Sequence, residues 1–151
     1  MRSKGAAMEK VRFIVPGEPT GKGRPRFRNM GRFHQAYTPE KTASYENLIK
    51  LQYQAQCGNW CYRKEDALGM LITAYKRIPA NTSQRKLRMM LDRIIYPGKK
   101  PDFDNIGKIC CDALNGIAFH DDAQIVDGRV IKLYAEQPRI EVEIWRLGQN
   151  G

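Results

Sequence analysis

The chain has 151 residues, 42% of them hydrophobic and 28% charged, which suits one domain with a single hydrophobic core. No apolar run approaches the ~20 residues of a membrane-spanning helix, and the first ten residues lack the apolar stretch of a secretory signal peptide. The net charge of +10 indicates a polyanionic partner such as nucleic acid.

We expect residues 8–147 to form one α+β domain, with a mixed β-sheet packed against helices. Residues 1–7 are expected to be a leader, either a remnant of an expression vector or disordered, with Met8 as the natural start. Alternating apolar residues predict a strand over Val11–Val15, which Pro16 ends. The Gly-, Pro- and Arg-rich segment that follows excludes a regular helix and suggests a hairpin around Asn29-Met30-Gly31.

Helical spacing then predicts a helix over Pro39–Gln56, capped by Thr38, with Tyr45, Leu48, Ile49 and Tyr53 as its apolar positions. A strand is predicted over Leu68–Tyr75, followed by a short basic helix over Asn81–Leu91 with Thr82 or Ser83 as cap, and then a Pro/Gly loop over Tyr96–Lys100.

A second amphipathic helix is predicted from Asp104, as its cap, to Asn115-Gly116. Its apolar stripe is Ile106, Ile109, Cys110, Ala113, Leu114 and Ile117. Two strands close the chain, over Ile125–Tyr134 and Arg139–Arg146, separated by a turn that contains Pro138; Ile140, Val142 and Ile144 point inward in the second.

Negative charge is concentrated near the end of this chain. Residues 1–100 carry 21 basic and 7 acidic side chains, whereas residues 101–151 carry 5 basic and 9 acidic ones. Six aspartates fall within 26 residues, at positions 102, 104, 112, 121, 122 and 127. An acidic focus in a phosphate-binding protein is electrostatically unfavourable unless a cation occupies it. The charge pattern therefore predicts a metal site.

The order of elements brings several of these aspartates toward one place. Asp102 and Asp104 alternate in what we expect to be an extended entry to the second helix, and Lys108 lies one turn later. Asp121 and Asp122 are expected at the start of the next strand. Carboxylates with few His or Cys favour a hard cation, Mg²⁺ or Mn²⁺, which polarises a phosphodiester and lowers the pKa of bound water. Taken singly, each aspartate is more often a helix cap or a solvated turn residue.

Four cysteines are present: Cys57, Cys61, Cys110 and Cys111. Reduced thiols, some of them filling the core, are favoured over a zinc site, because adjacent cysteines suit tetrahedral ligation poorly. His34 and His120 are interpreted as incidental, although His120 adjoins the acidic pair and a contact with substrate stays open.

The stretch PDFDNIGKICCDALNG followed by HDDAQIV resembles the signature of the RusA family of Holliday-junction resolvases, with matches at Asp102, Asp104, Asn105, Lys108, the Asp112-Ala113-Leu114 triplet, Asp121, Asp122, Gln124 and Ile125. The resemblance implies a cytoplasmic, bacterial or phage-encoded, Mg²⁺-dependent endodeoxyribonuclease that works as a homodimer without a small-molecule cofactor. It would nick branched DNA symmetrically in recombination and repair. Asp102, Asp104 and Asp122 would be catalytic with Lys108 supporting, and Asp102, Asp104, Asp121 and Asp122 would be the metal set.

A basic segment near the start of the chain is a candidate DNA arm, with two phenylalanines interleaved among Lys22, Arg24, Arg26, Arg28 and Arg32. Basic residues can contact phosphates while a ring stacks on an unpaired base; a solvated loop is the equally weighted alternative. Two other functions stay open: a DNA- or RNA-binding protein without catalysis, and a nuclease for flaps or replication forks.

Overall fold

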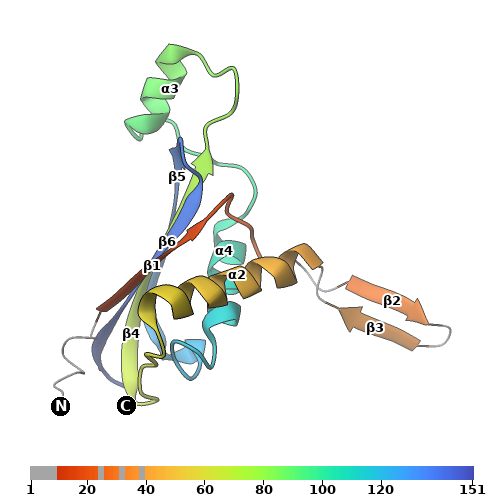
Figure 1. Cartoon of the computed structure of the whole chain (residues 1–151), viewed down its shortest axis with the longest axis vertical. Helices are drawn as coiled ribbons and strands as arrows, with labels where there is room; N and C mark the ends of the chain where they lie inside the picture. The colour runs from red at the N-terminus through yellow and green to blue at the C-terminus, as the bar shows by residue number, and fades with distance from the viewer. Residues whose placement is uncertain (1–9, 24–25, 31–32, 38–39) are drawn as a thin grey trace.

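A mixed four-stranded β-sheet with the order β1-β6-β4-β5 is the framework of the computed structural model, which describes residues 10–23, 26–30, 33–37 and 40–151 (Figure 1). The strands are β1 (Lys10–Pro16), β4 (Asp66–Arg77), β5 (Ile125–Ala135) and β6 (Arg139–Gln149). β6 pairs antiparallel with β1 and β4, and β5 lies parallel to β4. The predicted single α+β domain with a mixed sheet is therefore confirmed.

The four predicted core strands are all present, and each extends at most three residues beyond its predicted bounds. Their alternation explains which face is buried, because successive side chains of a strand point to opposite faces. The inward positions include Val11, Phe13 and Val15 of β1 and Ile140, Val142 and Ile144 of β6. As predicted, the last three are completely buried.

Two helices cover the inner face of this sheet, α2 (Glu40–Cys57) and α4 (Phe103–Leu114) (Figure 1). α2 matches the predicted helix closely, although its predicted cap, Thr38, and first residue, Pro39, lie outside the described residues. Tyr53 of α2 packs edge-on against Phe13, with ring centroids 5.3 Å apart. No helix in the described ranges has both the length and the apolarity to cross a membrane.

The connection from β4 to β5 contains the third α-helix of the described ranges, α3 (Gln84–Leu91), followed by α4. A parallel strand pair requires a long crossover of this kind. Ser83 caps α3 by accepting a hydrogen bond from the backbone N–H of Lys86 at 3.3 Å. The cap was predicted to be Thr82 or Ser83, so the second alternative is confirmed. Figure 1 shows α3 beyond the end of the sheet.

The basic segment after β1 contains the predicted hairpin, formed by β2 (Arg26–Met30) and β3 (Phe33–Tyr37). The register pairs Arg26 with Tyr37 and Met30 with Phe33. The hairpin extends away from the sheet and its covering helices (Figure 1). Gly31, which was predicted in its turn, lies outside the described residues.

Candidate active site

Asp102 and Asp104 lie at the start of α4, where the sequence-based expectation needs a correction. The predicted cap was Asp104, after an extended segment; in the structure Asp102 is the N-cap and Asp104 lies in the first helical turn. The carbonyl of Asp102 already accepts the hydrogen bond from Ile106 N at 3.1 Å, so the helix begins at Phe103. The side chain of Asp102 makes no capping hydrogen bond, which leaves its carboxylate available to other partners.

The loop that leads into α4 is held by lysines. Lys76 donates a hydrogen bond to the carbonyl of Lys100 at 2.9 Å, and Lys132 donates one to the carbonyl of Lys99 at 2.6 Å. The ammonium of Lys100 lies 3.1 Å from Oδ2 of Asp102. Because this last pair is largely exposed, it contributes little to stability and does not block a divalent cation from reaching Asp102.

On the polar face of α4, four charged side chains form a row of ion pairs. Nζ of Lys108 lies 3.6 Å from Oδ2 of Asp112, one turn further along, and Nζ of Lys22 lies 3.2 Å from the same oxygen. Lys22 also pairs with Glu46 of α2. Burial by itself would lower the pKa of Lys22, but the hydrogen bonds and charges of Glu46 and Asp112 outweigh burial and raise this pKa above its ordinary value. Lys22 is therefore a charged, largely buried link between two helices.

Lys22, one of the predicted DNA-binding residues, also fixes the segment before β2 on α4. Its backbone N–H donates to the carbonyl of Asn105 at 2.9 Å, so the segment before β2 docks directly on α4. Gly21 makes this approach possible, since a Cβ there would lie 2.9 Å from Cβ of Pro101. With two carboxylates on its ammonium, Lys22 anchors the segment leading to the hairpin, and its role in DNA binding stays a prediction.

Asp121 caps a short 3₁₀ turn over Asp122–Gln124, so both aspartates lie a few residues before the strand at whose start they were predicted. Oδ2 of Asp121 accepts a hydrogen bond from Ala123 N at 3.2 Å, which makes Asp121 the cap of this turn. The side chain of Asp122 is exposed. Strand β5 begins only at Ile125, after the turn has closed.

Gln124 holds this turn in place, a role that the sequence did not reveal. Its Oε1 accepts hydrogen bonds from the backbone N–H groups of His120 at 2.8 Å and Asp121 at 3.1 Å. Its Nε2 donates to the carbonyls of Arg63 at 2.8 Å and Asp66 at 3.1 Å. A single buried amide thus ties the Asp121-Asp122 turn to the start of β4. The signals in the sequence are the match of Gln124 to the family signature and its place between an acidic pair and an apolar strand, and neither indicates these partners.

Replacing Gln124 with methionine, which has a similar volume, is expected to lower the free energy of unfolding by about 2–4 kcal/mol. The reason is that the backbone N–H groups of His120 and Asp121 would lose their acceptor in a part-buried place. The carbonyls of Arg63 and Asp66 would keep their other hydrogen bonds, from Asp66 N at 3.0 Å and Asn150 Nδ2 at 2.9 Å. Urea denaturation measures the change, with Gln84→Met at the exposed start of α3 as the control. A loss as small as that of the control would contradict the role of Gln124.

The four predicted metal-binding aspartates do not meet as a closed site. Among the described residues, which include all four, no three His, Cys, Asp or Glu side chains are placed to hold a metal ion. Asp102 and Asp104 lie at the N-terminal end of α4. Asp122 lies near the second half of that helix, since burial and then the charge of Asp122 raise the pKa of Cys111 to about 11.

The donor chemistry nevertheless fits a hard cation. Asp102 is half exposed, Asp104 and Asp122 are exposed, and all three present oxygen atoms on or beside one helix. Thiolate ligands are disfavoured here, since all four cysteines are free and burial raises the pKa of each. Cys110 is completely buried, which confirms that part of the cysteine set fills the core.

The remaining arm residues are four arginines. Arg24 and Arg32 lie outside the described residues, and Arg26 and Arg28 lie in β2. A role for these four arginines in DNA binding therefore stays a prediction. His34 lies in β3, and His120 is exposed next to the 3₁₀ turn.

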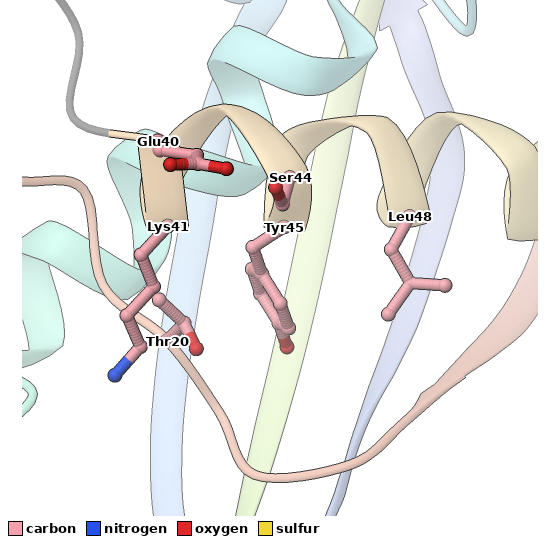
Figure 2. A pocket seen from close by; sticks show the side chains of 6 residues that line it. All are labelled: Thr20, Glu40, Lys41, Ser44, Tyr45 and Leu48. Atoms are coloured by element: carbon pink, nitrogen blue, oxygen red, sulfur yellow. The ribbon is translucent and has the colours of Figure 1, made fainter.

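A groove of about 530 Å³ lies beside the start of α2, where Thr20, Lys41 and Tyr45 border it (Figure 2). Tyr45 is 7% exposed, and burial raises the pKa of its phenol. Glu40 is the one acidic side chain among the described residues that line the groove. The groove therefore lacks the several carboxylates of a magnesium site, and the aspartates of α4 and of the 3₁₀ turn stay the candidates for chemistry.

Two comparisons with known proteins bear on this arrangement. The family described as "Endodeoxyribonuclease RusA" matches residues 16–145, a range that includes every aspartate discussed above. The chain is also 34% identical over 145 residues to a protein of Bacillus subtilis (strain 168) named "Uncharacterized protein YqaN", covering 91% of this chain and 96% of that protein. The predicted resemblance is confirmed, and the chain belongs to the RusA endodeoxyribonuclease family.

Proposed function

We propose that this chain is a Mg²⁺-dependent endonuclease that resolves four-way DNA junctions by paired, symmetric nicks in recombination and repair. The observation that carries the proposal is the set of accessible carboxylates along α4 and the 3₁₀ turn, in a member of a DNA endonuclease family with a net charge of +10. As a bacterial or phage-encoded protein, it would act on DNA in the cytoplasm.

Asp102, Asp104 and Asp122 are the proposed catalytic carboxylates and ligands of Mg²⁺, which Mn²⁺ can replace. Asp121, whose Oδ2 accepts the bond from Ala123 N, is the fourth proposed ligand of the metal set. The bound ion would polarise the scissile phosphodiester and favour deprotonation of a water molecule. Lys108, whose ammonium lies on the polar face of the same helix, would stabilise negative charge that develops on the phosphate.

A homodimer is part of the proposal because resolution of a four-way junction needs two opposed nicks. One domain with one set of carboxylates makes one nick at a time. Two copies related by a twofold axis would present two identical sets to a substrate that has its own twofold symmetry.

The test is cleavage of a synthetic four-way junction with labelled strands, in Mg²⁺ and in EDTA. We expect paired nicks at symmetric positions that require Mg²⁺, and no cleavage of linear duplex of the same sequence. Binding without cleavage in any divalent ion would favour the non-catalytic alternative. Preferred cleavage of flap or replication-fork substrates would favour the other nuclease function.

The basic hairpin segment is proposed to contact DNA phosphates. Replacing Arg24 and Arg26 with alanine should weaken junction binding and reduce the slope of log affinity against log salt by up to ~2 units, at ~0.9 per phosphate contact. The core should stay intact, because the sequence of this segment lacks the apolar periodicity of a core element. Affinity is measured by fluorescence anisotropy at several salt concentrations. An unchanged slope would show that the segment is a solvated loop that does not contact DNA.

A further inference from the structure

The crossover from β4 to α4 carries a concentration of positive charge that the catalytic proposal does not use. Residues 76–100 contain eight lysines and arginines and one acidic residue, Asp92. Within this segment α3 is held by Met90, which is only 8% exposed, and α3 contacts β5. This segment, which we call the projection, is therefore anchored to the sheet through α3 and can present its charges to a partner.

Four cations of this projection face solvent without a carboxylate partner. Arg85, Lys86, Arg88 and Arg93 are all exposed, and within the described ranges none has an acidic oxygen at ion-pair distance. Arg85 and Arg88 are three residues apart, so they are neighbours on the helix surface and repel each other. They lie on the side of α3 opposite Met90.

The cations at the opposite edge of the sheet are arranged differently. Lys10 and Arg12 of β1 are also exposed, but each is paired with a glutamate of β6: Lys10 with Glu143 at 2.6 Å and Arg12 with Glu141 at 2.8 Å. The fold thus neutralises charge along β1 and leaves it uncompensated on α3. Uncompensated repulsion on a short helix is relieved when a polyanion binds it.

The place of α3 in the chain favours DNA over a protein partner. The segment after α3 leads through the lysine-held loop directly into Asp102, so α3 and the candidate carboxylates at the start of α4 are joined by one short, fixed connection. The hairpin β2–β3 and α3 extend from different sides of the domain (Figure 1). A branched substrate, unlike one straight duplex, offers separate arms to two such projections.

We propose that α3 and the turn after it form a second DNA-binding surface, in which Arg85, Lys86, Arg88 and Arg93 contact phosphates of a duplex arm. This inference rests on the proposed function, because it takes DNA as the substrate, and it adds a contact surface distinct from both the hairpin and the carboxylates.

The test compares two double variants that remove the same net charge, Arg85→Gln with Arg88→Gln on α3, and Lys10→Gln with Arg12→Gln on β1. Binding to a labelled four-way junction is measured by anisotropy from 50 to 300 mM KCl in EDTA, where no cleavage occurs. We expect the α3 variant to lose ~1.8 units of salt slope, for two phosphate contacts, and about tenfold or more in affinity at 0.1 M salt. The β1 variant should keep nearly the whole slope.

Equal slopes in the two variants would overturn the role of α3, and so would failure of the wild-type protein to bind the junction. Circular dichroism checks that both variants fold. The result is separable from the proposed function, because nicking in Mg²⁺ at saturating protein tests catalysis alone. An α3 variant with an unchanged slope that still nicks junctions removes the inference but keeps the function. A wild-type protein that binds but never nicks removes the function, while the comparison of slopes still decides the role of α3.

Discussion

Asp102→Asn, Asp104→Asn and Asp122→Asn are each expected to lower Mg²⁺-dependent junction cleavage by at least ~100-fold, while junction binding is retained or tightened. Each substitution removes one anionic oxygen donor for the cation, and it also removes a negative charge that opposes the approach of phosphate. Folding should be preserved. Asn is as good an N-cap as Asp at position 102, and Asp104 and Asp122 are exposed.

The measurement is single-turnover cleavage at saturating protein, with junction affinity determined separately in Ca²⁺ or EDTA. Asp127→Asn is the matched control, because Asp127 is exposed in β5 within the same acidic stretch but lies outside the proposed set. Full nicking activity in any of the three variants would exclude that residue from catalysis. A comparable loss in the control would show that general charge, rather than ligation, governs the rate.

Asp121 needs a separate comparison because it has two assignments. Asn at position 121 can still accept the hydrogen bond from Ala123 that closes the 3₁₀ turn. A loss of cleavage in Asp121→Asn would therefore report on its charge and support ligation of the cation. Full activity in that variant would leave Asp121 as a cap alone.

The helices and strands of the fold could be predicted from the sequence because each follows a local pattern. Alternation in RIEVEIWR located β6, and the spacing of Ile106, Ile109 and Ala113 located α4. The start of α4 was harder to predict, since two aspartates two residues apart can both serve as caps. The choice was settled by which carbonyl accepts the first helical hydrogen bond, and that carbonyl belongs to Asp102.

The parts of the site that sequence reasoning missed depend on partners distant along the chain. The role of Lys22 follows from Glu46 and Asp112, which lie 24 and 90 positions away. Gln124 works through carbonyls about 60 residues earlier, at Arg63 and Asp66. Neither pairing leaves a local pattern, because both are created by the packing of α4 and of the 3₁₀ turn against other elements.

Lys108→Ala is expected to lower single-turnover cleavage by ~100-fold or more, the scale of losing one donor that stabilises developing charge. Lys108 is one turn beyond Asp104 on α4, and its side chain is 62% exposed, with Asp112 as its ion-pair partner at 3.6 Å. Because an exposed pair of this kind contributes only ~0–1 kcal/mol, thermal stability should barely change.

The competing explanation is that Lys108 only offsets repulsion among the aspartates when no metal is bound. In that case Lys108→Ala would lose stability in EDTA and recover nearly full cleavage at saturating Mg²⁺. Thermal unfolding and cleavage rates, both followed across a Mg²⁺ titration, separate the two roles. Lys64→Ala, at an exposed turn before β4, is the control for the loss of one surface charge. If Lys108 contacts the scissile phosphate, the cleavage rate of Lys108→Ala should stay low at every concentration of Mg²⁺. Recovery of the rate at high Mg²⁺ would mean that Lys108 only balances the charge of the aspartates.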